Sequence, residues 1–303
     1  MTSNVGGLDR KGIALALLAS LIWGGNTIAV KASLSDLPPF RLAWVRFIVG
    51  GLTLLVWAWL TKTSFKVRRE ERPILFLVGV IFIAQISLLH IGTNLTTAGQ
   101  TGVLLNVYPV HVILLSHFFI PGDRLTGRKL LAVLLAYAGA VLVFAPQVGG
   151  GEGSLTGDLL VSLSAVLLGI RTICLALAVQ RINQITILLG QCVMGVPAFF
   201  LMDVLLDRNI PTGYTGRMAL TVLYQGILVS GFNFMLNLWL LRRYQPSSVA
   251  PFYLTTPLFG VVLSWWLLGE PVTGYLVAGA ILVAAGIGLA ALPTLGDRAA
   301  RSR

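Results

Sequence analysis

Residues Gly102-Val-Leu-Leu-Asn-Val-Tyr-Pro109 return in altered form as Ala250-Pro-Phe-Tyr-Leu-Thr-Thr-Pro257. The two stretches are 148 residues apart, and each has a proline at the same place in an apolar run. After a one-residue gap the match continues, with Asp123-Arg-Leu-Thr126 opposite Glu270-Pro-Val-Thr273. A long period carried through successive segments indicates two copies of one structural unit.

The composition around these repeats is that of an integral membrane protein. Of the 303 residues, 56% are hydrophobic and 11% are charged, and the mean hydropathy is +0.86. Because a helix needs about 20 apolar residues to cross a bilayer, ten spans would occupy nearly the whole chain and leave no room for a soluble domain. We therefore predict an all-α integral membrane protein with ten transmembrane helices, near residues 12–31, 40–60, 73–93, 98–120, 127–146, 157–179, 184–206, 217–240, 247–268 and 273–292.

The basic residues are concentrated in every second loop between the predicted spans. The net charge of +11 could suggest nucleic acid, but the Lys and Arg residues form short clusters between apolar runs, so we expect no nucleic-acid partner. With the N-terminus inside, 16 of the 22 Lys and Arg residues face the cytoplasm, and Arg46 and Arg171 lie within spans. Only four face the other side: Lys31, Arg41, Arg208 and Arg217. The positive-inside rule then predicts two cytoplasmic termini in a multi-pass protein of the cytoplasmic (inner) membrane.

The two halves, 12–146 and 157–292, contain five predicted spans each and are joined by the Gly-rich linker Gly149–Gly153. An odd number of spans per half means that the copies are inserted in opposite orientations. Inverted-topology repeats are typical of secondary transporters, whose substrate site lies near the midplane between the repeats. We expect a carrier that moves a small-molecule substrate across the bilayer by alternating access.

Three motifs in the first half carry a family resemblance. Trp23-Gly-Gly-Asn-Thr27, Leu37-Pro-Pro39 and Arg46-Phe47 resemble the opening of EamA-type transporters of the drug/metabolite transporter superfamily. The stretches before Pro109 and around Gly269-Glu270-Pro271 are similar to that family's repeated pattern, so the resemblance covers nearly all of the chain. It implies a ten-helix carrier with a central cavity, often an exporter of amino acids or other small metabolites, although some relatives import or exchange them.

Polar residues within the spans are the candidates for substrate binding: Asn26, Thr27, Gln85, Arg171 and Asn233. Arg171 would lie about 12 Å deep in its span, too far to reach the interface easily, so it would suit a substrate carboxylate or phosphate. The alternative for each residue is a hydrogen bond that holds two helices together. Arg46 is nearer the end of its span and could reach the interface or phosphate headgroups, and for this residue we favour a structural role.

Two further features point to movement and coupling. His111 could couple transport to protons, since histidine titrates near physiological pH; a fixed interhelical hydrogen bond is the alternative. Pro109 and Pro257 remove a backbone hydrogen bond in mid-span and predict a helix kink, either one that bends during transport or a static one.

Other functional classes are less well supported. We expect no cofactor, no metal site and no enzymatic activity, because HExxH, GxSxG and Walker motifs are missing from the sequence. An uptake permease or exchanger of the same fold, or a membrane scaffold that does not transport, remains open. The sequence is also compatible with a homodimer.

Overall fold

The computed structural model describes residues 9–65, 67–119, 125–148, 154–244 and 255–291, and this part of the chain contains helices and no strands. The helices of the first half are α1 (Arg10–Gly24), α2 (Asn26–Leu34), α3 (Pro39–Leu60), a 3-10 turn (Arg69–Glu71), α4 (Arg72–Leu95), α5 (Ala98–Leu105), α6 (Tyr108–Phe119) and α7 (Gly127–Val148). Those of the second half are α8 (Leu155–Ala178), α9 (Gln184–Met202), η2 (Asp203–Asp207), α10 (Gly216–Leu223), η3 (Tyr224–Asn233), α11 (Phe234–Arg243), α13 (Thr255–Leu268) and α14 (Gly274–Ala291).

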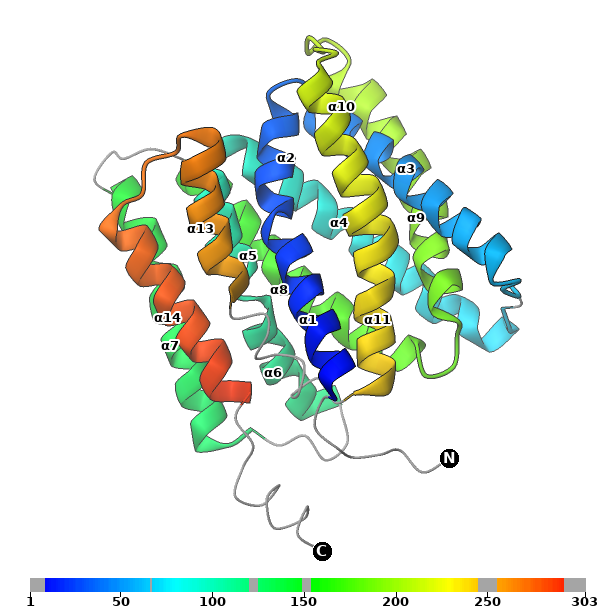
Figure 1. The fold of residues 1–303 in the computed structure, drawn as a ribbon, viewed down its shortest axis with the longest axis horizontal. Helices are drawn as coiled ribbons and strands as arrows, with labels where there is room; N and C mark the ends of the chain where they lie inside the picture. The colour runs from blue at the N-terminus through cyan, green and yellow to red at the C-terminus, as the bar shows by residue number, and fades with distance from the viewer. Residues whose placement is uncertain (1–8, 66, 120–124, 149–153, 245–254, 292–303) are drawn as a thin grey trace, which may run out of the picture.

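Apolar helices of membrane-spanning length run through most of the chain. Seven in the described residues are long and apolar enough to cross a bilayer: Arg10–Leu34, Pro39–Leu60, Arg69–Leu95, Ala98–Phe119, Leu155–Ala178, Gln184–Asp207 and Gly216–Leu240. Each of the ten predicted ranges contains a helix, although residues 247–254 of the ninth lie outside the described part. The beginning of α1 and the end of α14 lie at the same end of the bundle (Figure 1). The number of spans and the cytoplasmic placement of the termini stay predictions.

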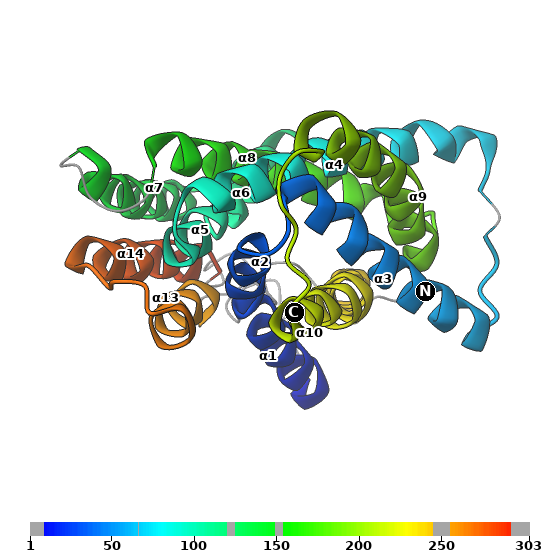
Figure 2. The ribbon, with the colours of Figure 1, turned by 90° about the horizontal axis from the view of Figure 1, so that it is seen from above.

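The helices of the two halves are interleaved in two layers. Seen from above, one layer contains α7, α6, α8, α4 and α9, and the other contains α14, α13, α1 with α2, α10 with α11, and α3 (Figure 2). Three helices pack directly against their repeat counterparts, in the pairs α3 with α9, α5 with α13 and α7 with α14. The contact of α4 with α8 has its equivalent in that of α1 with η3. This pattern is what two copies related by a two-fold axis would give.

Glycines bring α7 and α14 into close contact. A Cβ atom added at Gly139 would lie 2.6 Å from the carbonyl oxygen of Gly279, and one at Gly286 would lie 2.6 Å from that of Ala132. The missing side chains let the two helices approach closely, as in other small-residue interfaces of membrane helices.

Several spans are irregular near the middle. The first span is divided between α1 and α2 at Gly25, and the fourth between α5 and α6 at Asn106 and Val107. Pro109 is the second residue of α6, where a missing N–H costs least. Pro257 is likewise in the first turn of α13, but the residues before α13 are outside the described part, as are Asp123 and the linker 149–153.

The eighth predicted span changes from α-helical to π-helical geometry over η3. Such π-helical turns are rare and are often found at functional sites. Here the segment carries Gln225, Ser230 and Asn233, whose side chains are all buried.

Candidate functional site

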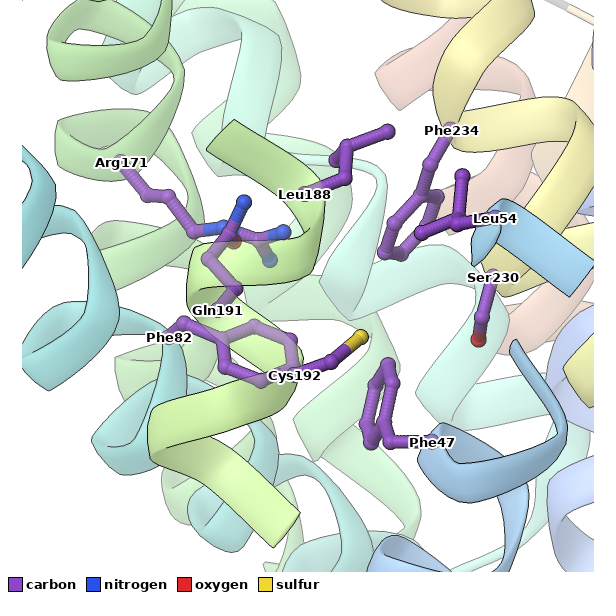
Figure 3. Close-up of a pocket in the computed structure, with 9 residues that line it drawn as sticks. All are labelled: Phe47, Leu54, Phe82, Arg171, Leu188, Gln191, Cys192, Ser230 and Phe234. Carbon is purple, nitrogen blue, oxygen red and sulfur yellow. The ribbon is translucent and has the colours of Figure 1, made fainter. Parts of the chain in front are cut away.

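A small cavity lies where α3, α4, α8, α9, η3 and α11 meet. Its lining comes from both halves of the chain: Phe47, Leu54, Phe82, Arg171, Leu188, Gln191, Cys192, Ser230 and Phe234. Figure 3 shows the Arg171 side chain extending from α8 toward the middle of this group, with Phe234 and Ser230 on the opposite side. The volume open to a water-sized sphere is about 10 Å³, the least that holds one water molecule. A metabolite would therefore enter only after the helices separate.

Arg171 reaches the cavity from α8 and is 3% exposed. One guanidinium nitrogen, Nη1, donates to Oε1 of Gln85 at 3.0 Å. The guanidinium carbon lies 4.7 Å from the ring centroid of Phe82 and 5.5 Å from that of Phe234. Gln85 is fixed in turn, because its Nε2 donates to Ser164 Oγ at 3.0 Å and its backbone carbonyl oxygen accepts from that hydroxyl. These bonds join α4 to α8 and hold the arginine over the rings of Phe82 and Phe234.

A second buried arginine, Arg46 of α3, lies beside the same cavity. It is 1% exposed, so its guanidinium is buried among the helices instead of extending to the interface. Its Nη1 lies 3.2 Å from both His90 Nε2 and Gln225 Oε1, and its Nη2 donates to the cavity residue Ser230 at 3.4 Å. His90 Nδ1 lies 3.0 Å from the Pro39 carbonyl oxygen, which can only accept, so Nε2 is the nitrogen that accepts from Arg46.

The two guanidinium groups are not neutralised within the described residues. Neither forms an ion pair with a carboxylate there, and the Nε atom of each is buried without a hydrogen-bond partner. A buried cation is costly unless it is paired, and in a membrane protein such groups usually mark a functional pathway. Two guanidinium groups and three aromatic rings around one cavity can bind an anionic group while covering its apolar part.

The structure separates the five predicted substrate-binding residues. Gln85 and Arg171 are in contact, and Arg171 lines the cavity. Asn233 instead joins η3 to α1, since its Nδ2 donates to the carbonyl oxygen of Ala19 at 3.1 Å. Asn26 and Thr27 are buried at the start of α2 and are not among the cavity-lining residues. The amide oxygens of Asn26 and Asn233 have no hydrogen-bond partner in the described part of the chain.

His111 lies on α6, outside the cavity lining, with its ring 5.7 Å from that of Tyr137. Sequence reasoning missed the aromatic wall of Phe47, Phe82 and Phe234. The sequence did contain one signal that Arg46 lies beside the cavity. A shift of 145 residues aligns Arg46 with Gln191, and Gln191 lines the cavity.

Comparison with known proteins agrees with this architecture. The EamA-like transporter family matches the chain twice, over residues 10–145 and 155–292. A solved crystal structure matches with a TM-score of 0.71 and covers 93% of this chain and 98% of its own; at 20% identity it shows the fold alone.

Curated relatives cover almost the whole chain. The uncharacterized transporter YoaV of Bacillus subtilis is 22% identical, over 88% of this chain and 92% of its own length. A probable amino-acid metabolite efflux pump of Escherichia coli is 26% identical, over 92% and 94% respectively. The resemblance seen in the motifs is therefore confirmed, and this chain belongs to the EamA-like transporter family.

Proposed function

We propose that this chain is a secondary transporter of the cytoplasmic membrane that exports small metabolites bearing a carboxylate group, by alternating access. The observation that carries the proposal is the pair of buried arginines, Arg46 and Arg171, beside a cavity with no described carboxylate to neutralise them. The carboxylate of the solute would supply the missing negative charge, with Arg171 as the direct anchor.

The aromatic residues favour a solute with an apolar part as well as an acidic one. Phe82 and Phe234 lie under the Arg171 guanidinium, and Phe47 packs edge-on against Phe82 with the ring centroids 4.7 Å apart. A small amino acid or organic acid has this combination. The Escherichia coli relative named a probable amino-acid metabolite efflux pump supports the same substrate class and the export direction.

The decisive experiment is transport by the purified protein in liposomes. Vesicles loaded with amino acids, organic acids, amines or sugars would be tested for exchange against the labelled solute, with Arg171→Leu as the matched inactive variant. We expect exchange of carboxylate-bearing solutes by the wild-type protein and loss of exchange by the variant. Transport of cationic amines alone would refute the substrate class.

The same vesicles distinguish the alternatives. Measuring net efflux and net uptake separately under an imposed solute gradient distinguishes an exporter from an uptake permease or an exchanger. A scaffold that does not transport would give no flux with any solute, while the wild-type and Arg171→Leu proteins would express and fold equally well.

A further inference from the structure

Asp158 is a buried acid that the proposed substrate site does not use. It lies in the first turn of α8, is 0% exposed, and faces the segment that joins α4 to α5. Its Oδ1 is 2.6 Å from the hydroxyl oxygen of Thr96, and its Oδ2 is buried without a hydrogen-bond partner in the described residues.

The Thr96 hydroxyl is shared by two acceptors. Its Oγ1 lies 2.6 Å from Asp158 Oδ1 and 2.7 Å from Gln100 Oε1. A hydroxyl has one proton to donate, so it cannot serve both oxygens if Asp158 is ionised. Reversing the Gln100 amide would turn its NH2 group toward the Thr97 N–H, a donor that faces Oε1 at 3.4 Å in a capping box, so the amide oxygen stays on this side.

A proton on Asp158 resolves the conflict. The acid would then donate to Thr96 Oγ1, and Thr96 would donate to Gln100 Oε1, which gives a continuous chain from α8 through the end of α4 to α5. Without that proton, one short oxygen–oxygen contact has no hydrogen between its atoms, and a buried carboxylate is left unpaired.

The charged groups around Asp158 have other partners. From α2, the Lys31 ammonium donates to the backbone carbonyls of Thr93, Asn94 and Thr96. After α13, the Glu270 carboxylate accepts from the N–H groups of Ala98 and Gly99. Among the described residues of α4, α5 and α8, none forms an ion pair with Asp158. The acid therefore has no described counter-ion, and its charge is governed by proton binding.

We propose that Asp158 is a proton-binding site whose occupancy closes this end of the bundle, so that transport is coupled to protons. A proton from water binds a carboxylate oxygen and completes the chain that joins α4, α5 and α8. Release of the proton to water leaves the buried charge uncompensated and favours separation of these helices. The proposal rests on the transport function proposed above, but proton binding by Asp158 can be measured without transport.

Infrared difference spectra of the purified protein, recorded between acidic and alkaline pH, test the proton directly. We expect a band from the C=O stretch of a protonated carboxylic acid that is absent in Asp158→Asn. Asp36→Asn is the matched control, because Asp36 is ion-paired with the exposed Arg217 at 3.4 Å; it should leave the band unchanged. Should the asparagine variant not fold, Asp158→Glu serves instead, and a band that neither disappears nor shifts overturns the proposal.

Liposome transport tests the coupling. The amide of Asp158→Asn can donate to Thr96 as the protonated acid does but has no proton to release, so this variant should hold this end closed more of the time, exchange solute more slowly than the wild type and lose the acceleration by a pH gradient. A gradient response equal to that of the wild type overturns the proposal, as does loss of the response in His111→Gln together with its survival in Asp158→Asn. If the wild-type protein exchanges none of the carboxylate-bearing solutes, the proposed substrate class fails, and the infrared band still decides the role of Asp158.

Discussion

At Arg171, a guanidinium group donates to a neutral amide and lies over two aromatic rings, so its charge is stabilised but not neutralised. A lysine at this position would keep the charge and lose the planar fork that holds Gln85 and a carboxylate at the same time. We expect Arg171→Lys to bind carboxylate-bearing solutes about tenfold or more weakly, the equivalent of about 1.4 kcal/mol. Solute-dependent protection of the purified protein against heat would measure this affinity.

A matched control for Arg171 comes from the lining of the same cavity. Leu188 also lines the cavity and is uncharged, and Leu188→Met conserves its volume, so the affinity should change little. An equal loss of affinity in Arg171→Lys and Leu188→Met would mean that packing, and not the guanidinium, governs solute binding.

At the scale of the helices, the contact between α7 and α14 depends on the absence of side chains. Because a Cβ at Gly139 would meet the Gly279 carbonyl oxygen at 2.6 Å, Gly139→Ala should destabilise the protein by about 1–3 kcal/mol. Thermal unfolding in detergent would show the loss as a lower melting temperature.

Gly190 on α9 provides the control, since a Cβ there would have no atom within 4 Å. Gly190→Ala should leave the melting temperature unchanged or raise it, because alanine is the better helix former. If both alanine variants melted like the wild type, the α7–α14 contact would have to be more adaptable than its geometry indicates.

These helices also show what could be predicted from sequence. The positions of the long apolar helices follow from hydropathy, and the repeat follows from the matched Pro109 and Pro257, because both signals lie within a short stretch of chain. The direction in which a side chain points depends on packing between distant segments. Arg46 thus contacts Gln225 and Ser230, about 180 residues away, and no local pattern distinguishes that burial from contact with the interface. The π-helical geometry of η3, which carries both partners, is likewise set by tertiary packing.

At the scale of the whole molecule, contacts between the two halves lie at each end of the bundle. At one end, the Arg41 guanidinium of α3 pairs with Asp203 of η2 at 3.0 Å, and the Trp44 indole donates to the same carboxylate. At the other end, Asp9 before α1 accepts from the Tyr244 hydroxyl after α11, with 2.7 Å between the oxygens. Alternating access would require these two sets of contacts to break in turn.

The Asp9 contact is also sensitive to pH. The Gly12 N–H and the Tyr244 hydroxyl both donate to the carboxylate and lower the pKa of Asp9 below its ordinary value. A carboxyl group with a lowered pKa stabilises the folded contact above its unfolded pKa and loses that effect as pH falls through the folded pKa. Acid should therefore loosen the end of the bundle where α1 begins.

Cys192 can report both openings, since its thiol lines the cavity and the residue is 9% exposed. In a Cys174→Ala background, a membrane-impermeant thiol reagent would label Cys192 only when one end opens. Asp203→Asn removes a charged hydrogen-bond acceptor, so we expect labelling from the side of that end to become about tenfold faster. Tyr244→Phe should accelerate labelling from the opposite side of the membrane.

Arg217→Ala is the matched control, because it breaks the exposed ion pair with Asp36 at the same end as Asp203. Exposed pairs contribute about 0–1 kcal/mol, so labelling should barely change. Sidedness is what makes the test specific to alternating access, since general loosening of the fold would expose Cys192 to both sides in every variant. Faster labelling of Cys192 from both sides in Asp203→Asn would thus argue against two ends that open independently. Faster labelling from opposite sides of the membrane in Asp203→Asn and Tyr244→Phe is expected only if the cavity opens to one side at a time.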